Sequence, residues 1–378
     1  MVDNKHGMRA VILVGGFGTR LRPLTFTVPK PLVPMCNKPM IIHQVEALKK
    51  AGVTEVILAV SYRPDIMRAE MDKWAHKIGV SFVYSVENEP LGTAGPLSLI
   101  REILMQDDNP FFVLNSDVVC KFPLEDFLKF HIKHGKEGSI MVTKVKDWDK
   151  YGVVVYDAKT SCIEGFLEKP KQFVGDHINA GIYIFNKNML SRIPQTRASM
   201  ETQIFPNMVL DNQLCAYNLE GFWMDIGQPH DFIIGMGKLL PFLSETTYKT
   251  EEAHIEKTRD GSKLGFKVLG NVLIDPTATI GAGSVIGPNV SIGSNCRIGP
   301  FCHIHSAAIF DNTTIGAASV ISHSIIGWSN RIGNWCHVEN DSVLGNDVEV
   351  SDDVIVNCVK VLPNKAISVN HFEPEILM

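Results

Sequence analysis

The sequence predicts two domains of different class, an α/β domain with a mostly parallel sheet and, after it, a parallel β-helix. From Arg9 to about Gln228, apolar runs alternate with longer amphipathic stretches, as strands and helices do in α/β proteins. Past residue 270, aliphatic residues instead recur every six positions, a period typical of stacked β-helix coils. The 378 residues suffice for two domains, and 45% hydrophobic residues suit packed cores.

In the first domain, the pattern predicts individual elements. The expected strands include Val56–Val60, Phe111–Asn115 and Ile140–Val145, and the stretches with helical spacing include Ile41–Ala51, Ile66–His76 and Leu124–His134. Strand–helix alternation of this kind predicts a Rossmann-like, mostly parallel sheet with helices on both faces. Ligands bind to such sheets at the carboxyl ends of the strands, so we expect the functional residues there.

In the second domain, the hexapeptide period predicts a left-handed parallel β-helix. The aliphatic positions are Ile274, Ile280, Ile286, Ile292, Ile298 and Ile304, then Ile315 and Ile321 after a short slip, and, after one five-residue step, Ile326, Ile332, Val338, Leu344, Val350 and Val356. Glycine directly follows many of them. Each six-residue unit is expected to form one flat side, with the aliphatic residue in the core and small residues at the corner.

These patterns divide the chain into four parts. A leader covers residues 1–8, the α/β domain residues 9–245, a charged and polar linker residues 246–269, and the β-helix residues 270–378. A stretch with helical spacing, from Phe232 to Leu243, closes the α/β domain.

Composition and charge exclude several classes of protein. The formal net charge of −5 argues against non-specific nucleic-acid binding. The eight cysteines form no Cys-x-x-Cys pair, which indicates unpaired thiols in a reducing compartment. No apolar run approaches the ~20 residues of a membrane span, and the leader lacks the apolar core of a signal peptide. The sequence therefore predicts a cytoplasmic protein.

A glycine-rich segment follows the first apolar run, Ala10–Val14. Three glycines, Gly15, Gly16 and Gly18, let the backbone approach a ligand closely and expose its N–H groups. Arg20 and Lys30 add two positive charges, which together with free N–H groups are what a triphosphate needs. The segment lacks both the Gly-Lys-Ser/Thr of a P-loop and the third glycine of a dinucleotide fingerprint.

Two acidic residues are candidates for a metal site. Asp117 follows the apolar run Phe111–Leu114, and Asp225 lies in the apolar segment Gly221–Gly227. Together they are expected to hold Mg²⁺, which takes one or two carboxylates with phosphate oxygens and water. Taken alone, Asp117 is equally well interpreted as a turn or helix-cap residue.

The string GGFGTRLRPLT…PKPL, which begins at Gly15, resembles the signature of the sugar-phosphate nucleotidyltransferases. Almost the whole chain is similar to one branch of that family, the catalytic-subunit type of mannose-1-phosphate guanylyltransferases, also called GDP-mannose pyrophosphorylases. The similar motifs are Asn37–Met40, Pro90–Leu97, Phe111–Asp117, Lys150–Val155 and Gly221–Pro229. The resemblance implies an enzyme that converts GTP and mannose 1-phosphate into GDP-mannose and pyrophosphate, with Mg²⁺ as cofactor.

The resemblance also implies roles for individual residues. The nucleotide is expected at Leu13, Gly15, Gly16, Gly18, Thr19, Arg20, Lys30, Gly92, Asn115 and Asp117, and the sugar phosphate at Gly152, Glu168, Lys169, Asn179 and Asp225. Arg20, Lys30 and Lys169 are the expected catalytic cations, and Asp117 and Asp225 the metal ligands. From the residues alone, Glu168-Lys169 also fits a solvated surface pair, and Glu89–Gly95 also fits a turn at the start of a helix.

Three alternatives stay open at this point. The chain could be a non-catalytic scaffold, a regulatory paralogue of the enzyme, or a related pyrophosphorylase for another nucleotide or sugar. Scaffold and regulatory proteins are expected to lose catalytic cations or acids, and here Arg20, Lys30, Asp117, Lys169 and Asp225 are all present. Because the ends of a β-helix expose unpaired backbone groups, we also expect a homo-oligomer, or a heteromer with a regulatory paralogue, formed through the β-helix domain.

Overall fold

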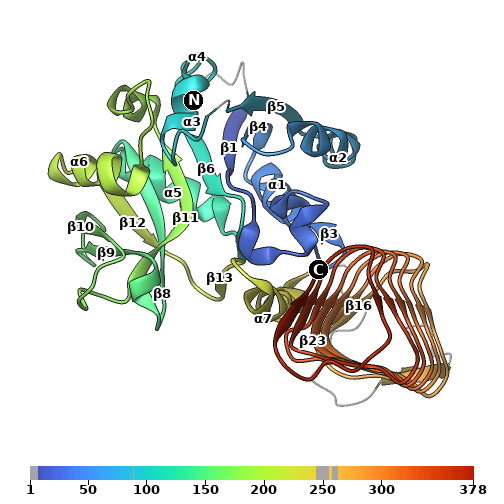
Figure 1. Cartoon of the computed structure of the whole chain (residues 1–378). Coiled ribbons are helices and arrows are strands. Elements are labelled where there is room, and N and C mark those ends of the chain that lie inside the picture. The colour runs from blue at the N-terminus through green and yellow to red at the C-terminus, as the bar shows by residue number, and fades with distance from the viewer. Residues whose placement is uncertain (1–6, 88, 244–254, 258–262) are drawn as a thin grey trace. The chain divides into compact units, whose positions relative to one another are not determined.

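The chain folds into two compact units. The computed structural model describes residues 7–87, 89–243, 255–257 and 263–378 (Figure 1). The first unit comprises the residues up to Gly16 together with Ile41–Trp223. The second comprises Phe17–Met40 and Met224–Met378, so a short segment near the N-terminus folds with the C-terminal part of the chain. The glycine-rich segment is thus divided between the units, directly after Gly16.

The first unit is built on a mixed sheet. Its strands are β1 (Met8–Val14), β4 (Val53–Val60), β5 (Ser81–Val86), β6 (Phe111–Asn115), β8 (Gly138–Lys144), β9 (Gly152–Tyr156), β10 (Ile163–Glu168), β11 (His177–Phe185) and β12 (Leu214–Asn218). Short strand β7 (Val118–Cys120) follows β6. The helices are α1 (Met40–Lys50), α2 (Pro64–Ile78), α3 (Gly95–Leu99), α4 (Arg101–Leu104), α5 (Leu124–His134) and α6 (Phe205–Leu210), with short turns η4 (Trp148–Lys150), η5 (Lys187–Arg192) and η6 (Met200–Ile204). The strands and helices that the sequence predicted in this part are confirmed.

The order of the strands sets the position of the site. Strands run in the order β10-β9-β11-β6-β1-β4-β5, and β8 and β12 branch from β11. β1 pairs in parallel with both β4 and β6, while β11 is antiparallel to β6, β8 and β9. The chain therefore leaves β1 toward β4 and β5 and returns to β6 on the other side. A crevice forms at such a switch point, outside the carboxyl ends of the strands.

One face of this sheet buries the larger core of the unit. Residues of alternating strand positions, such as Val11, Val113 and Tyr183, pack there against α3, α4, η6 and α6. Tyr183, Phe185 and Phe205 form ring contacts within it, with centroids 5.3–6.4 Å apart. The alternation follows from the strand geometry, which points successive side chains to opposite faces.

The second unit begins with turns η1 (Thr19–Leu21), η2 (Leu24–Phe26) and η3 (Lys30–Leu32), and the hairpin β2 (Pro34–Met35) and β3 (Lys38–Pro39). It resumes with β13 (Trp223–Asp225), α7 (Pro229–Leu239) and η7 (Leu240–Phe242). β14 (Ile255–Lys257) pairs antiparallel with β15 (Lys263–Val268), at the start of the β-helix. The β-helix strands are β15, β16 (Val272–Ile274), β17 (Thr279–Ile280), β18 (Val285–Ile286), β19 (Val290–Ile292), β20 (Arg297–Ile298), β21 (His303–Ile309), β22 (Thr314–Ile315), β23 (Val320–Ile326), β24 (Arg331–Ile332), β25 (His337–Glu339), β26 (Val343–Leu344), β27 (Glu349–Val350), β28 (Ile355–Asn357), β29 (Val359–Val361), β30 (Ala366–Ile367) and β31 (Glu375–Leu377).

The parallel β-helix predicted from the hexapeptide period is confirmed, and its coils stack visibly in Figure 1. On one side, Ile280, Ile298, Ile315, Ile332, Val350 and Ile367 pair in sequence, so the coils are 18, 17, 17, 18 and 17 residues long. The shorter coils explain the slip in the period. β21 and β23 run through a corner as continuous strands, and their inward residues, Ile304 to Ile309 and Ile321 to Ile326, are five positions apart.

Glycines form a ladder along one corner of the β-helix. A Cβ on Gly299 would lie 2.7 Å from the Ala317 nitrogen, and one on Gly316 would lie 2.6 Å from the Gly333 carbonyl carbon. Successive coils therefore approach each other more closely here than any side chain allows. This contact, rather than an unusual backbone angle, explains why glycine follows the aliphatic residue at these positions.

The segment Phe17–Met40 packs on the β-helix and α7 inside the second unit. The Thr27 hydroxyl donates to Asn346 Oδ1 at 3.0 Å, and the Asn37 amide donates to the Ile292 carbonyl at 2.7 Å. α7 joins the same core, since the Ser291 hydroxyl lies 3.2 Å from Met236 Sδ and the Phe232 and Phe310 rings are in contact. The expected domain boundary near residue 245 therefore does not coincide with the boundary of the compact unit, which precedes α7. Part of the expected linker lies outside the described residues.

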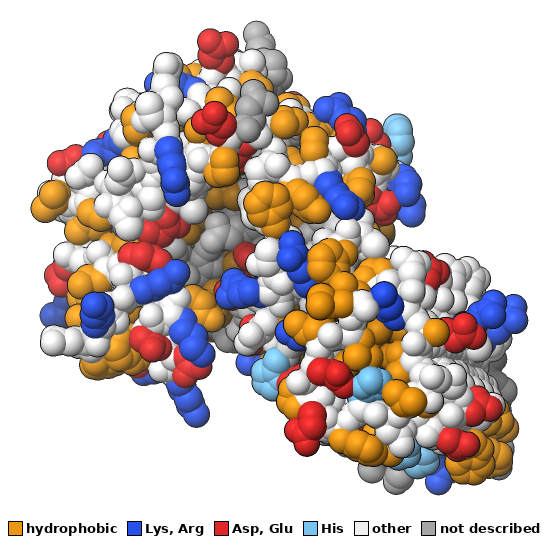
Figure 2. All heavy atoms as spheres, viewed as in Figure 1, with side chains coloured by type: hydrophobic (Ala, Val, Ile, Leu, Met, Phe, Trp, Pro, Cys, Tyr) orange, Lys and Arg blue, Asp and Glu red, His pale blue; other side chains and the backbone are white. Residues whose placement is uncertain are grey.

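The surface carries no large region of one charge on the face shown in Figure 2, where Lys and Arg side chains are interspersed with Asp and Glu. On this face, binding of an anion would therefore depend on a few local cations. Among the described helices, none is both long and apolar enough to cross a membrane.

Candidate active site

A cavity of about 340 Å³ opens at the switch point of the sheet in the first unit. Segments that follow four neighbouring strands, β1, β4, β5 and β6, contribute to its wall. The lining residues are Leu13, Gly15, Gly16, Ser61, Glu87, Pro90, Gly92, Thr93, Pro96, Asn115, Ser116 and Asp117. The sequence predicted Leu13, Gly15, Gly16, Gly92, Asn115 and Asp117 as nucleotide-binding residues, and the structure brings these six together.

Gly15 and Gly16 give the cavity an exposed backbone wall directly after β1. No described atom lies within 4 Å of the position that a Cβ would take at either residue. Gly16 has a φ of 86°, which strongly favours glycine. A ligand can therefore approach the main chain at this point without meeting a side chain.

The buried Gln44 of α1 holds the turn Asn115–Asp117 in place through hydrogen bonds. The Gln44 amide donates to the Asn115 carbonyl at 2.8 Å and to the Val118 carbonyl at 3.0 Å. The Ser116 N–H donates to the Leu13 carbonyl at 3.3 Å and so joins the ends of β6 and β1. Gln44 is a positioning residue that the sequence analysis missed, because nothing in the helix pattern distinguishes it from other polar residues.

Glu87 is the second residue that the sequence analysis missed. It directly follows β5 and is only 9% exposed at the cavity wall. Burial raises the pKa of its carboxyl group above the usual value, although the Leu91 N–H, which donates to Oε2 at 3.2 Å, acts in the opposite direction. A buried carboxylate at a cavity wall is available to accept hydrogen bonds from a ligand. The sequence did offer one indication of this residue, because Glu87 is an acidic residue directly after the strand that ends at Val86.

The loop Pro90–Gly95 is anchored to the segment before η6. Ala94 N–H donates to the Ala198 carbonyl at 3.0 Å, and Ala198 N–H donates to the Leu91 carbonyl at 3.0 Å. Gly92 has a φ of 80°, and a Cβ there would lie 2.4 Å from the Ala198 oxygen, so no other residue fits without displacement. α3 begins at Gly95, as expected for a turn at the start of a helix, and Gly92 also lines the cavity.

The four residues predicted for the sugar phosphate within this unit also lie together, on β9, β10 and β11. Gly152 pairs directly with Glu168, and a Cβ on Gly152 would lie 2.9 Å from Glu168 Oε2. Lys169 has a φ of 45° and lies 3.6 Å, Nζ to Oε1, from Glu168. Asn179 donates to the Tyr183 hydroxyl at 2.8 Å and accepts from Gly181 N–H at 2.9 Å.

Gly181 connects this cluster with the cavity. It has a φ of 73°, and a Cβ there would lie 2.7 Å from the side-chain nitrogen of Asn115. The backbone of β11 therefore passes directly over Asn115. This close approach places the predicted sugar residue Asn179 two positions from a residue of the cavity wall.

The buried Tyr183 hydroxyl lies within the electrostatic influence of three carboxylates. Burial raises the pKa of Tyr183 most, and the charges of Glu201, Glu168 and Asp117 raise it further. Glu201 also accepts hydrogen bonds from Thr93 at 2.6 Å and from Ser199 at 2.8 Å. The pKa of Glu168 is raised by burial and then by Glu201, while Lys169 lowers it. Such a concentration of negative charge favours a cation or the hydroxyl groups of a sugar.

The remaining predicted residues belong to the second unit. Gly18 has a φ of 61° and is held by Thr25, whose hydroxyl donates to the Gly18 carbonyl at 2.8 Å. Lys30 Cβ lies 3.1 Å from the position of a Cβ on Gly18. The exposed Arg20, next to Thr19, places its guanidinium against Gly227, two residues after the half-buried Asp225. This unit therefore carries both predicted triphosphate cations and one predicted metal ligand.

The donors available for a metal are sparse but suitable for magnesium. Within the described residues, no group of three or more His, Cys, Asp or Glu side chains is arranged to hold a metal ion. Asp117 lies at the cavity wall, and Asp225 belongs to the other unit. Mg²⁺ usually takes one or two carboxylates and keeps water and phosphate oxygens as its other ligands, so Asp117 at the cavity wall is a donor of the type that Mg²⁺ takes.

Comparisons with known proteins cover both parts of the chain. A family model described as Nucleotidyl transferase matches residues 9–240, and one described as GMPPB C-terminal domain matches residues 268–377. The mannose-1-phosphate guanyltransferase beta-B of Xenopus laevis is 51% identical over 371 residues, which cover 98% of this chain and 100% of that protein. The chain belongs to the mannose-1-phosphate guanylyltransferase family. The mannose-1-phosphate guanyltransferase of Gibberella zeae is 50% identical over 372 residues, with 98% and 100% covered.

One solved structure is similar to this chain over 61% of its length. HddC from Yersinia pseudotuberculosis, complexed with GMP-PN, aligns with a TM-score of 0.51 and 28% identity over 61% of this chain and 99% of that chain. The family assignment confirms the resemblance found in the sequence, and the protein is a nucleotidyltransferase enzyme.

Proposed function

We propose that the chain transfers the GMP group of GTP to mannose 1-phosphate, which yields GDP-mannose and pyrophosphate. The names of its relatives support this reaction. The structural observation that carries it is the cavity at the ends of β1 and β6, where an exposed glycine backbone, a buried carboxylate and an aspartate meet.

Glu87 supports guanine as the base. Guanine presents two adjacent donors, N1–H and the 2-amino group, and a carboxylate accepts both. Adenine has an unprotonated N1 and therefore does not offer this pair. In the proposed complex, Glu87 reads the base edge, while the Leu91 N–H keeps the carboxylate in place and Gly92 lets the loop approach the base.

The sugar phosphate is proposed to bind at the cluster on β9, β10 and β11. Lys169 would hold the phosphate of mannose 1-phosphate and reduce repulsion between the two anionic substrates. Glu168 and Asn179 would bind sugar hydroxyls, and Gly152 leaves room for the sugar beside them. The negative charge around Tyr183 suits sugar hydroxyls, which donate hydrogen bonds to it.

The reaction needs positioning and charge neutralisation more than acid–base catalysis. The phosphate oxygen of mannose 1-phosphate is already ionised, and it attacks the α-phosphorus of GTP in line with the departing pyrophosphate. Arg20 and Lys30 would hold the β- and γ-phosphates and stabilise the leaving group, and Thr19 and Gly18 would offer backbone contacts. Asp117 and Asp225 would hold Mg²⁺, which neutralises charge on the phosphates when bound.

A turnover assay over a matrix of substrates tests the proposed function. GTP, ATP, UTP and dTTP are each paired with mannose 1-phosphate and glucose 1-phosphate, and pyrophosphate release is measured. We expect the highest kcat/KM for GTP with mannose 1-phosphate. A higher value for another pair would identify a related pyrophosphorylase, and no turnover with any pair would indicate a scaffold or regulatory protein.

Two further proposals concern where and how the enzyme works. All eight cysteines are free, which supports a cytoplasmic location. The chain is also proposed to form a homo-oligomer, or a heteromer with a regulatory paralogue, through residues 270–378.

A further inference from the structure

A pair of cysteines lies away from the cavity, between β10 and β12. Cys162 and Cys215 face each other across an antiparallel bridge, and Cys162 directly precedes β10. The Ala216 N–H donates to the Ser161 carbonyl at 2.8 Å, which places the two cysteines at a non-hydrogen-bonded position of the bridge. At such positions the Cα atoms are about 4.5 Å apart and the side chains are close. A disulfide requires Cα atoms about 4.4–6.8 Å apart, so the backbone permits one here.

The two thiols differ in access and in electrostatic surroundings. Cys162 is partly exposed, whereas Cys215 is fully buried. Lys136 Nζ donates a hydrogen bond to Cys162 Sγ at 2.9 Å. This hydrogen bond lowers the pKa of Cys162, and a hydrogen bond from the Cys215 thiol lowers it as well. Burial raises the pKa of Cys215 to about 11. The accessible thiol is therefore the one that ionises first.

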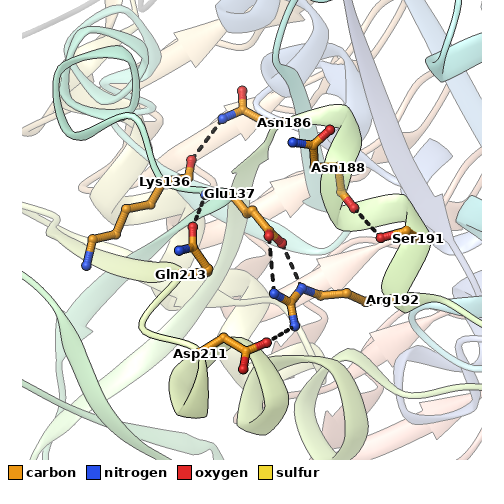
Figure 3. A network of polar contacts seen from close by, with 8 residues as sticks. All are labelled: Lys136, Glu137, Asn186, Asn188, Ser191, Arg192, Asp211 and Gln213. Carbon is orange, nitrogen blue, oxygen red and sulfur yellow. Dashed lines mark hydrogen bonds and ion pairs between the residues drawn. The ribbon is translucent and has the colours of Figure 1, made fainter.

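Lys136 is fixed in place by a polar network. Its carbonyl accepts a hydrogen bond from the Asn186 amide at 2.8 Å, and its ammonium also donates to Asn212 at 2.8 Å. The adjacent Glu137 forms a two-point ion pair with Arg192, at 2.7 and 3.1 Å. Figure 3 shows this network, with the Lys136 side chain extending away from its other members. The Lys136 ammonium thus has two acceptors, the Cys162 sulfur and Asn212 Oδ1.

We propose that Cys162 and Cys215 form a peroxide-sensitive redox site, in which Cys162 is the reacting thiolate and Cys215 the resolving thiol. In the first step, the Cys162 thiolate attacks a hydroperoxide. An S–O bond forms, the O–O bond breaks, and the leaving alkoxide or hydroxide takes a proton. The sulfur becomes a sulfenic acid, and the peroxide is reduced to an alcohol or water.

In the second step, the Cys215 sulfur attacks the sulfenic sulfur of Cys162. An S–S bond forms, the S–O bond breaks, and hydroxide leaves as water with the proton of the Cys215 thiol. The disulfide joins the beginning of β10 to β12. A dithiol reductant restores both thiols, so the modification is reversible.

Mass spectrometry on the full-length protein tests this site. After treatment with hydrogen peroxide, we expect a Cys162–Cys215 cross-linked peptide about 2 Da lighter than the two reduced peptides, and its loss after dithiothreitol. In the Cys215→Ser variant, the sulfenic acid at Cys162 should persist and react with dimedone. A Cys162–Cys215 pair that stays reduced in the peroxide-treated wild type would overturn the proposal.

Alkylation rates test the role of Lys136. Iodoacetamide should modify Cys162 faster than Cys358, a partly exposed cysteine of the β-helix that serves as an internal reference. Lys136→Met should slow the alkylation of Cys162 by about threefold for each pKa unit gained, because the smaller thiolate fraction is partly offset by a more nucleophilic thiolate. Lys133→Met, at an exposed position of α5, should not slow it. Equal rates at Cys162 and Cys358 in the wild type would contradict an activated thiolate. That comparison decides the point even if the Lys136 variant does not fold.

Discussion

At the scale of single residues, the buried Glu87 is proposed to bind the base, and burial of its ionised carboxyl group lowers the stability of the folded protein. Its pKa in the folded protein is raised above its value in the unfolded chain. A carboxyl group shifted in this direction adds stability below its unfolded pKa, and this contribution is lost as the pH rises through the folded pKa. Above that folded pKa the ionised Glu87 therefore opposes folding, which is consistent with a residue retained for binding.

Glu87→Gln separates these two effects. Because an amide oxygen and an amino group cannot accept both guanine donors, kcat/KM for GTP should fall by roughly ten- to a hundredfold. Above the folded pKa of Glu87 the variant should unfold at a higher temperature than the wild type, and this difference should disappear as the pH falls through that pKa. Kinetics and calorimetry check the two outcomes. Glu89→Gln, at an exposed position two residues later, is the control, and an equal loss in that variant would contradict the role of Glu87.

Lys169 should act on the sugar phosphate and not on the triphosphate. A charge-assisted contact to a phosphate contributes roughly 1.5–3 kcal/mol, so Lys169→Ala should weaken mannose 1-phosphate binding more than tenfold. GTP affinity should change little. Isothermal titration calorimetry measures both affinities, with the exposed Lys171→Ala as the control. A loss confined to GTP would reverse the proposed roles.

Substitutions of Asp225 and Asp117 test the proposed metal site. Asp225→Asn and Asp117→Asn should each strongly reduce turnover while the circular dichroism spectrum and melting temperature stay close to those of the wild type, because the loss falls on transition-state charge. The measurement is kcat as a function of Mg²⁺ concentration. Near-normal kcat for Asp225→Asn at saturating Mg²⁺ would remove this residue from the site.

At the scale of elements, the glycine ladder makes the stacking of coils sensitive to one methyl group. A Cβ on Gly316 would lie 2.6 Å from both the carbonyl carbon and the oxygen of Gly333 in the next coil. Backbone atoms cannot move aside as a flexible side chain can, so Gly316→Ala should lower the free energy of unfolding by about 1–3 kcal/mol. In Gly265→Ala, by contrast, the nearest atom is 3.8 Å away. Chemical denaturation of both variants checks the contrast, and equal stabilities would contradict it.

The elements also show which features a sequence makes visible. The β-helix could be predicted because each coil repeats the same local contacts, so aliphatic residues recur in the sequence every six positions. The slip after Ile304 could not be interpreted beforehand, because it depends on β21 continuing through a corner instead of turning. Gly15, Asn115 and Asp117 were found from motifs, whereas Gln44 and Glu87 were missed. Their roles come from burial and from partners on other elements, which a local pattern does not contain.

At the scale of the whole molecule, the division into units could not be predicted from the order of motifs. The sequence places the glycine-rich segment entirely in the α/β domain, but Phe17–Met40 forms part of the unit that contains the β-helix. The hydrogen bonds that fix it join residues 255 and 319 positions apart. Periodicity and motifs describe local sequence, so they do not reveal contacts between residues this far apart in the chain.

The quaternary structure stays a prediction, and light scattering tests it. The full chain has a mass of 41.9 kDa, and we expect a multiple of this mass at micromolar concentration. Phe301 and Trp335, each 64% exposed on the β-helix, are apolar candidates for the contact. The double variant Phe301→Ser/Trp335→Ser should shift the mass toward the monomer. A wild-type chain that is monomeric both alone and with a regulatory paralogue would contradict assembly through residues 270–378.

The packing of Phe17–Met40 on distant partners has a consequence for synthesis on the ribosome. This segment leaves the exit tunnel among the first parts of the chain, yet Ile292 and Asn346, which fix it, are translated near the end. Until then, the segment with Arg20 and Lys30 lacks the surface on which it folds. A nascent or prematurely terminated chain therefore carries these two cations in an unfinished arrangement. The order of translation thus makes completion of the chain a precondition for the mature conformation of this segment.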